Sequence, residues 1–151
     1  MFILPLVRGL EDLAVRLLPA WLAALALRVA LAVPFFKSGL TKWDGPGQLS
    51  ESAVLLFTDE FKLHIFGKAY DFPFPTLMAY GSGIAEIILP ALLVAGLFTR
   101  FAALGLLVMT VIVQLTVPTG WPIHLSWAAM AAGIIAIGPG RLALDPLFTR
   151  R

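Results

Sequence analysis

Four long apolar runs constrain this chain more than any other feature of its sequence. They cover about residues 17–36, 76–98, 101–117 and 123–138. A helix of about 20 apolar residues crosses the roughly 30 Å hydrocarbon layer of a bilayer. Hydrophobic residues make up 60% of the chain and charged residues 13%, a composition too apolar for a soluble core of this size. The sequence therefore predicts an all-α integral membrane protein with a single domain over residues 1–151.

The connections between the runs predict how the four helices are arranged. Residues 96–103 and 117–122 leave only tight turns between the second and third runs and between the third and fourth. Successive helices joined by short turns must be antiparallel neighbours. We therefore expect an up-down bundle of four transmembrane helices, with both termini on the same side of the membrane.

Two segments outside the runs have the pattern of amphipathic helices. Residues 50–66 lie in the long loop, residues 37–75, and mix apolar with charged side chains at helical spacing. Within residues 6–17, the apolar side chains would form one stripe along a helix. Oppositely charged residues four positions apart would lie on the other side of that helix. We expect the loop helix to lie against the bundle or the headgroups, and the N-terminal helix to be interfacial.

The basic residues predict the orientation of the bundle. The side that holds both termini carries six arginines and the opposite side four lysines, namely Arg8, Arg16, Arg100, Arg141, Arg150 and Arg151 against Lys37, Lys42, Lys62 and Lys68. Cytoplasmic segments of membrane proteins carry an excess of lysine and arginine. The termini are therefore expected in the cytoplasm.

Two charged residues lie inside the apolar runs. Arg28 and Glu86 are each near the middle of a run and are its only full charge. A charge at the centre of the bilayer costs about 2.5–3.5 kcal/mol on insertion scales, so it usually faces a partner or a wet cavity. Because their signs are opposite and their expected depths similar, we predict that Arg28 and Glu86 form a buried pair. The sequence leaves open whether this pair only ties two helices together or belongs to a working site for a ligand, a proton or a quinone.

Further polar residues extend this predicted cluster toward the side of the long loop. Gln114 lies near the end of the third run, His124 lies at the start of the fourth, and Lys42 and Trp121 belong to the same side. Together with the two buried charges, these residues predict a ligand-binding site or a polar path that leads to mid-membrane. The alternative reading is that they are ordinary residues of the membrane interface.

Composition and motifs disfavour several classes of function. The chain has no cysteine, which excludes disulfides, iron–sulfur clusters and covalent haem attachment. Its two histidines lack the spacing of metal ligands, so we expect no metal site. A net charge of +2 without a basic run among aromatics argues against nucleic acid. Since no catalytic arrangement stands out, a non-catalytic subunit is favoured over an autonomous enzyme.

Three stretches of the chain resemble the DoxX family of small four-helix bacterial membrane proteins. The first is Arg28 followed by FFKSGLTKW at residues 35–43, and the second is GIAEIILPALLVAGLFTRFAALGLL at residues 83–107. The third is the tryptophan–proline turn that leads into a fourth helix rich in small residues. The resemblance covers about residues 20–140 and places the family's recurring polar positions at Arg28, Lys42, Glu86 and Arg100.

The resemblance implies a redox or stress-response setting. Relatives include the small subunit of a thiosulfate:quinone oxidoreductase, partners in membrane redox-stress complexes and helpers in maturing periplasmic redox proteins. It implies an accessory protein of the bacterial inner membrane whose partners are the bilayer, a redox subunit and further copies of itself. A quinone or another small apolar ligand would bind near Arg28 and Glu86. Where relatives carry redox cysteines this chain has none, which argues against autonomous electron transfer.

Two other functions stay open at the level of the sequence. The first is a transporter or exporter of a small solute or metal ion, with the two buried charges as a gate. Four helices without a clear inverted repeat offer little machinery for alternating access. The second is a membrane scaffold without any ligand.

Overall fold

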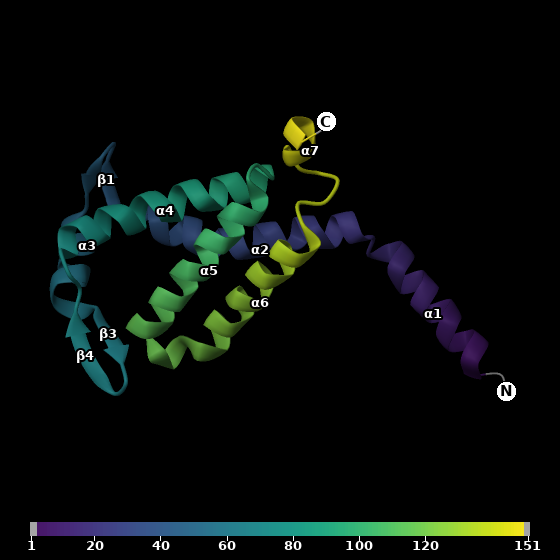
Figure 1. The fold of residues 1–151 in the computed structure, drawn as a ribbon, viewed down its shortest axis with the longest axis horizontal. Coiled ribbons are helices and arrows are strands. Elements are labelled where there is room, and N and C mark those ends of the chain that lie inside the picture. The colour runs from purple at the N-terminus through teal and green to yellow at the C-terminus, as the bar shows by residue number, and fades with distance from the viewer. Residues whose placement is uncertain (1–2, 150–151) are drawn as a thin grey trace.

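The chain is mostly helical, and the computed structural model describes residues 3–149 (Figure 1). The α-helices in this part of the chain are α1 (Ile3–Leu17), α2 (Ala20–Leu40), α3 (Glu51–Leu55), α4 (Pro75–Ala95), α5 (Thr99–Thr116), α6 (Trp121–Ile137) and α7 (Asp145–Thr149). A π-helix, η1 (Leu56–Glu60), and a 3₁₀-helix, η2 (Pro118–Gly120), complete the helical elements. Two antiparallel hairpins pair β1 (Trp43–Gly45) with β2 (Gln48–Leu49) and β3 (Lys62–Ile65) with β4 (Lys68–Asp71).

Four of these helical segments are long and apolar enough to cross a bilayer. They are α2, α4, α5 and the segment Pro118–Ile137, which consists of η2 and α6. The four predicted runs are therefore confirmed as helices, with ends that differ by a few residues. The first span starts later than predicted because Pro19 separates it from α1: the ring disfavours helical backbone in the residue before it. The same helix continues past Phe36 to Leu40.

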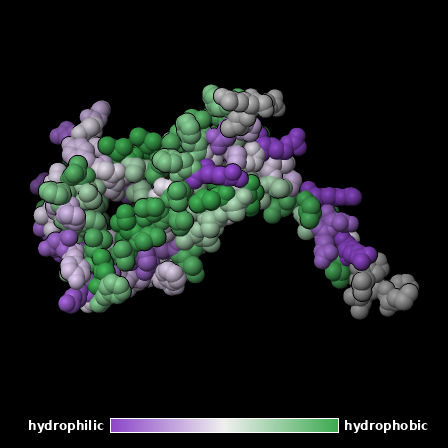
Figure 2. Space-filling view, in the orientation of Figure 1, coloured by the Kyte–Doolittle hydropathy of each residue, from purple (hydrophilic) through white to green (hydrophobic). Residues whose placement is uncertain are grey.

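The four long helices enclose a common core. Helix α2 packs against α4 and α6, and α5 packs against the same two helices. The buried residues at their centre include Leu31, Leu93, Leu106 and Ile134, with alanines between them where the backbones come close. Figure 2 shows a hydrophobic surface over the middle of these helices and more hydrophilic surface toward both ends. How the helices run through a bilayer stays a prediction.

Helices α2 and α4 are staggered along each other. Gly39, near the end of α2, lies against Glu86 in the middle of α4, and Arg28 lies against Gly96, just after the end of α4. The two helices are therefore antiparallel, and the first half of α4 extends beyond the end of α2. We call the end of the bundle with the hairpins the loop end and the end with α1 and α7 the terminal end (Figure 1).

The long loop folds into a layer over the protruding half of α4. Ser50 begins its helical part, since its hydroxyl accepts a hydrogen bond from the amide of Ala53 at 3.2 Å. The helix predicted over residues 50–66 is only partly correct, because α3 and η1 end at Glu60 and the chain then forms the β3–β4 hairpin. A second small core, which includes Phe57, Phe72 and Ala79, fastens this layer to α4.

The N-terminal helix predicted from the apolar stripe is present as α1. In Figure 1 it extends away from the body of the molecule at the terminal end. Its position at a membrane interface stays a prediction, as does that of α3. The side chain of Leu6 and residues Arg150 and Arg151 lie outside the described part of the chain.

Candidate functional site

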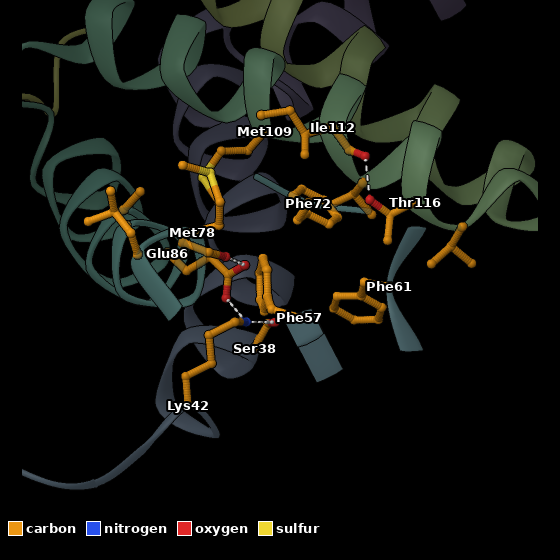
Figure 3. A pocket seen from close by; sticks show the side chains of 16 residues that line it. Ser38, Lys42, Phe57, Phe61, Phe72, Met78, Glu86, Met109, Ile112 and Thr116 are labelled. Carbon is orange, nitrogen blue, oxygen red and sulfur yellow. Dashed lines mark hydrogen bonds and ion pairs between the residues drawn. The ribbon is translucent and has the colours of Figure 1, made fainter. Parts of the chain in front are cut away.

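A buried ion pair joins Lys42 and Glu86 at the loop end of the bundle. The Nζ of Lys42 lies 2.5 Å from Oε2 of Glu86, and the side chains are 10% and 5% exposed. Two serine hydroxyls complete the network shown in Figure 3. Lys42 Nζ also donates to Ser38 Oγ at 3.1 Å, while Ser82 Oγ donates to Oε1 of Glu86 at 2.9 Å. Each charge thus has an opposite charge and a hydroxyl as partners, which offsets its desolvation.

The stagger of the helices creates this pair. Lys42 follows the last turn of α2, so it would lie at the membrane surface if the two helices ended together. Because α2 ends beside the middle of α4, Lys42 reaches Glu86 instead. Gly39 permits the close approach: a Cβ at this position would lie 2.9 Å from the Cβ of Glu86 and 3.0 Å from its carbonyl oxygen.

An apolar cavity of about 390 Å³ ends at this ion pair. It lies between the first half of α4, the second half of α5 and the loop layer (Figure 3). Its apolar lining includes Phe57, Phe61, Phe72, Met78, Met109 and Ile112, and its polar lining includes Ser38, Lys42, Ser82, Glu86 and Thr116. Phe57 contacts both other rings edge-on, with centroids 5.4 Å apart in each case. The cavity has the size and the lining of a site for a small, largely apolar molecule.

The predicted pairing of Arg28 with Glu86 is wrong. The guanidinium of Arg28 donates through Nη1 to the carbonyl oxygens of Leu93 and Val94, at 3.4 and 3.3 Å, and through Nη2 to that of Leu142. Leu93 is seven residues from Glu86, which is ~10 Å along a helix. The two charges lie at different depths because α2 extends past the end of α4 at the terminal end.

Arg28 instead stabilises the C-terminal end of α4. The last carbonyl groups of a helix lack partners within the helix, and its dipole favours a cation at this end. Arg28 is fully buried and supplies both the donors and the charge. The close approach needs Gly96, which has a φ of 69° and where a Cβ would overlap Arg28 and Ala143. The buried arginine is therefore part of the fold at the terminal end and lies outside the cavity.

Asp145 fastens the C-terminal segment to the same end of the bundle. Its carboxylate accepts hydrogen bonds from the backbone amides of Phe98 and Thr99, at 2.6 and 2.9 Å, and so caps α5. Burial raises the pKa of Asp145, but the hydrogen bonds from Thr99 and Phe98 and the charge of Arg28 outweigh it. The net result is a pKa below the usual range of a carboxyl group. Asp145 therefore stabilises the fold at neutral pH, and this contribution is lost as the pH falls through the lowered pKa.

The remaining predicted site residues lie apart from the cavity. Nδ1 of His124 and Oε1 of Gln114 are 2.8 Å apart, so these two residues join α6 to α5 at the loop end. Trp121 begins α6 and is 55% exposed. Neither the histidine nor the glutamine lines the cavity. Of the six predicted residues, the structure brings Lys42 to Glu86 and Gln114 to His124, and it leaves Arg28 and Trp121 elsewhere.

Sequence reasoning did not assign several residues of the site. Ser38 and Ser82 each lie four residues before the charge that they contact, a spacing that brings side chains together on a helix. That signal was available in the sequence. The three phenylalanines of the loop layer had no such signal, because their positions depend on how the loop folds over α4. Within residues 3–149, no three histidine, aspartate or glutamate side chains are grouped as metal ligands.

The fold and the site define a small helical membrane protein with a loop-covered cavity. The chain belongs to the DoxX family, whose sequence pattern matches residues 23–119. It is also 28% identical over 157 aligned residues to an uncharacterized protein of Haemophilus influenzae, and the alignment covers 93% of each chain. No solved structure matches the sequence.

Proposed function

We propose that this protein binds a quinone, or a closely similar neutral ring compound, in the cavity between α4, α5 and the loop layer. The observation that carries the proposal is the buried Lys42–Glu86 pair at the end of an otherwise apolar cavity of about 390 Å³. Aromatic and methionine side chains suit a flat, polarisable ring. The sequence predicted a ligand site near Arg28 and Glu86. The site proposed here keeps Glu86 but has Lys42 in place of Arg28.

The charges at the end of the cavity favour a neutral headgroup. Lys42 and Glu86 cancel each other, so an anionic headgroup meets the carboxylate and a cationic one meets the ammonium. Lys42 Nζ carries three protons, and Glu86 and Ser38 account for two of them. The third can be donated to a ligand carbonyl, while free lone pairs of Glu86 can accept from a ligand hydroxyl. A quinone and its reduced form offer these two groups, and neither carries a net charge.

The family membership supports a role as an accessory subunit. We infer that the four spans form an up-down bundle in the bacterial inner membrane, with α1 and α3 at the interfaces and the termini in the cytoplasm. In this position the protein holds a membrane-soluble ligand for a redox or stress-response partner. Binding and exchange need no cysteine, which fits a chain that has none.

A cavity-filling substitution tests the ligand site. Gly81 lines the cavity, and a Cβ there would have no neighbour within 4 Å. Gly81→Leu therefore fills space without straining the fold. The control is Gly9→Leu, the same change in α1, where an added Cβ would also have no neighbour within 4 Å. Each protein is purified from cells in mild detergent, and its quinone content is measured by native mass spectrometry and by analysis of lipid extracts.

We expect quinone in a stoichiometric amount with the unaltered protein and the Gly9→Leu control, and a loss of at least about tenfold with Gly81→Leu. Glu86→Ala should reduce the amount as well. Unaltered protein without quinone or another neutral ring compound would contradict the proposal. Uptake of a solute by proteoliposomes would then be the next measurement, since it distinguishes a transporter from a scaffold.

A further inference from the structure

The tip of the β3–β4 hairpin carries a phenylalanine in a conformation that bulky residues avoid. Phe66 has a φ of 50° and Gly67 a φ of 76°, and they form the two-residue turn between the paired residues Ile65 and Lys68. Turns of this kind favour asparagine followed by glycine, because both central residues need positive φ. A bulky side chain with positive φ is an outlier that the local structure disfavours. The turn itself therefore does not explain why a phenylalanine is present at this position.

Packing within the chain does not supply that reason. Phe66 is 102% exposed, so its ring contacts almost nothing else in the described structure. Glycine or asparagine would fit the turn better and would leave the rest of the hairpin unchanged. The ring is thus positioned for a contact outside the protein.

The hairpin that carries this ring is fixed to the end of a helix long enough to cross a bilayer. Nδ1 of His64 lies 3.1 Å from the carbonyl oxygen of Leu115, in the last turn of α5, and β3 packs against this helix. Helix α5 is of spanning length and ends at Thr116. A residue beside its last turn is therefore level with the boundary between hydrocarbon and headgroups. Trp121, exposed at the start of α6, lies at the same end.

The orientation and support of the hairpin direct its tip toward lipid. In Figure 1 the hairpin runs across the axis of α4 at the loop end, which would place its strands roughly in the plane of a membrane that α4 crosses. Leu63 packs on the small core of the loop layer, which fixes the base of the hairpin. Lys68 follows the turn and is exposed, where its ammonium can reach headgroup phosphates.

We propose that Phe66 anchors the β3–β4 hairpin in the bilayer, with its ring inserted at the boundary between headgroups and acyl chains in the leaflet at the loop end. Aromatic side chains are enriched at this depth in membrane proteins. The anchor also bears on the cavity. The hairpin follows Phe61 and precedes Phe72, two residues that line the cavity, so lipid contact at the tip steadies the cavity wall. The insertion itself does not depend on any ligand.

Spin labels on a cysteine-free chain test the depth directly. The protein has no native cysteine, so Lys68→Cys, Asp59→Cys and Val108→Cys each give one labelled site, and the first leaves the ring of Phe66 in place beside the label. Asp59 is an exposed residue of η1, and Val108 is a 52% exposed residue in the middle of α5. In nanodiscs of phosphatidylethanolamine and phosphatidylglycerol, the accessibility of each label to oxygen and to a water-soluble nickel complex is measured.

We expect the oxygen-to-nickel accessibility ratio at the Lys68 site to be several-fold above that at the Asp59 site and below that at the Val108 site. A ratio equal to that at the Asp59 site would place the tip in water and overturn the proposal. The result holds whether or not the purified protein carries quinone, so the two proposals fail separately.

A second variant keeps the native backbone and removes only the ring. Phe66→Gly fits the turn, so the midpoint of thermal unfolding in detergent should stay equal or rise. In nanodiscs, amide hydrogen exchange over residues 62–71 should become several-fold faster because the anchor is gone. Phe98→Gly is the control, since Phe98 has the same φ of 50° at the terminal end. Unchanged exchange in the hairpin of the Phe66→Gly protein would overturn the proposal.

Discussion

Individual charged residues in this protein are stabilised in two different ways. Lys42 and Glu86 neutralise each other and share their remaining hydrogen bonds with serine hydroxyls. Arg28 donates hydrogen bonds to backbone carbonyl groups at the C-terminal end of α4. The negative end of that helix dipole stabilises its positive charge. Both arrangements satisfy the demand that a charge in a membrane helix face a partner. Only the first leaves polar groups at the wall of a cavity, where a ligand can reach them.

Removal of one partner of the Lys42–Glu86 pair should cost far more stability than removal of both. Glu86→Gln leaves the Lys42 ammonium, and Lys42→Met the Glu86 carboxylate, as a buried charge without its counter-charge. We expect either one to lower the free energy of unfolding by about 3–5 kcal/mol. The double substitution should cost much less than the sum of the two. Unfolding in mixed micelles measures each value, and additive losses would show that the two side chains are not coupled.

At the scale of whole elements, the stagger of α2 against α4 positions the site. It places the end of α2 beside the middle of α4 and leaves the first half of α4 for the loop layer to cover. Gly39 is the contact on which this arrangement depends, since its missing side chain lets the two backbones approach at Glu86. Gly81 lies on the same helix as Glu86 but faces open space. The two glycines therefore respond differently to the same methyl group.

Gly39→Ala should destabilise the protein and Gly81→Ala should not. The methyl group at residue 39 would press on the Cβ and the backbone of Glu86, and overpacking of this kind costs about 1–3 kcal/mol. At residue 81 the methyl group meets nothing, and alanine is favoured over glycine in a helix by up to about 1 kcal/mol. Free energies of unfolding of both variants check this. Equal effects would mean that α2 and α4 do not pack closely at Glu86.

For the whole molecule, the two ends of the bundle differ in structure. The loop end holds the cavity, the ion pair and the hairpins. At the terminal end, Arg28 and Asp145 join α2, the turn between α4 and α5, and the C-terminal segment. The amides of Leu144 and Asp145 also donate to the carbonyl oxygens of Ala95 and Gly96, at 3.3 and 2.8 Å. The terminal end is thus held together by hydrogen bonds between its segments, whereas the loop end encloses a cavity.

We expect the two ends to lie on opposite sides of the membrane. Single-cysteine variants Asp59→Cys in the loop and Glu11→Cys in α1 report the two sides, since the chain has no other cysteine. In spheroplasts, a membrane-impermeant maleimide should label the loop site at once and the α1 site only after lysis. Labelling of both sites before lysis would contradict a membrane crossing by α2, the one candidate span between residues 11 and 59. The reverse pattern would invert the orientation.

Four helices long and apolar enough to cross a bilayer could be predicted from the sequence, because the length and apolar character of a segment are local properties. The sequence also singled out Arg28 and Glu86 as unusual charges, and it placed Lys42 among the polar residues on the side of the long loop. The partner of each charge was decided by the tertiary structure, since the offset between two antiparallel helices depends on close contacts such as that of Gly39 with Glu86. The prediction that Arg28 pairs with Glu86 assumed that both lie at the same depth. The stagger of α2 against α4 places them at different depths. The cavity likewise exists only because residues distant in sequence, from the loop layer and from α5, meet over the half of α4 that α2 leaves uncovered.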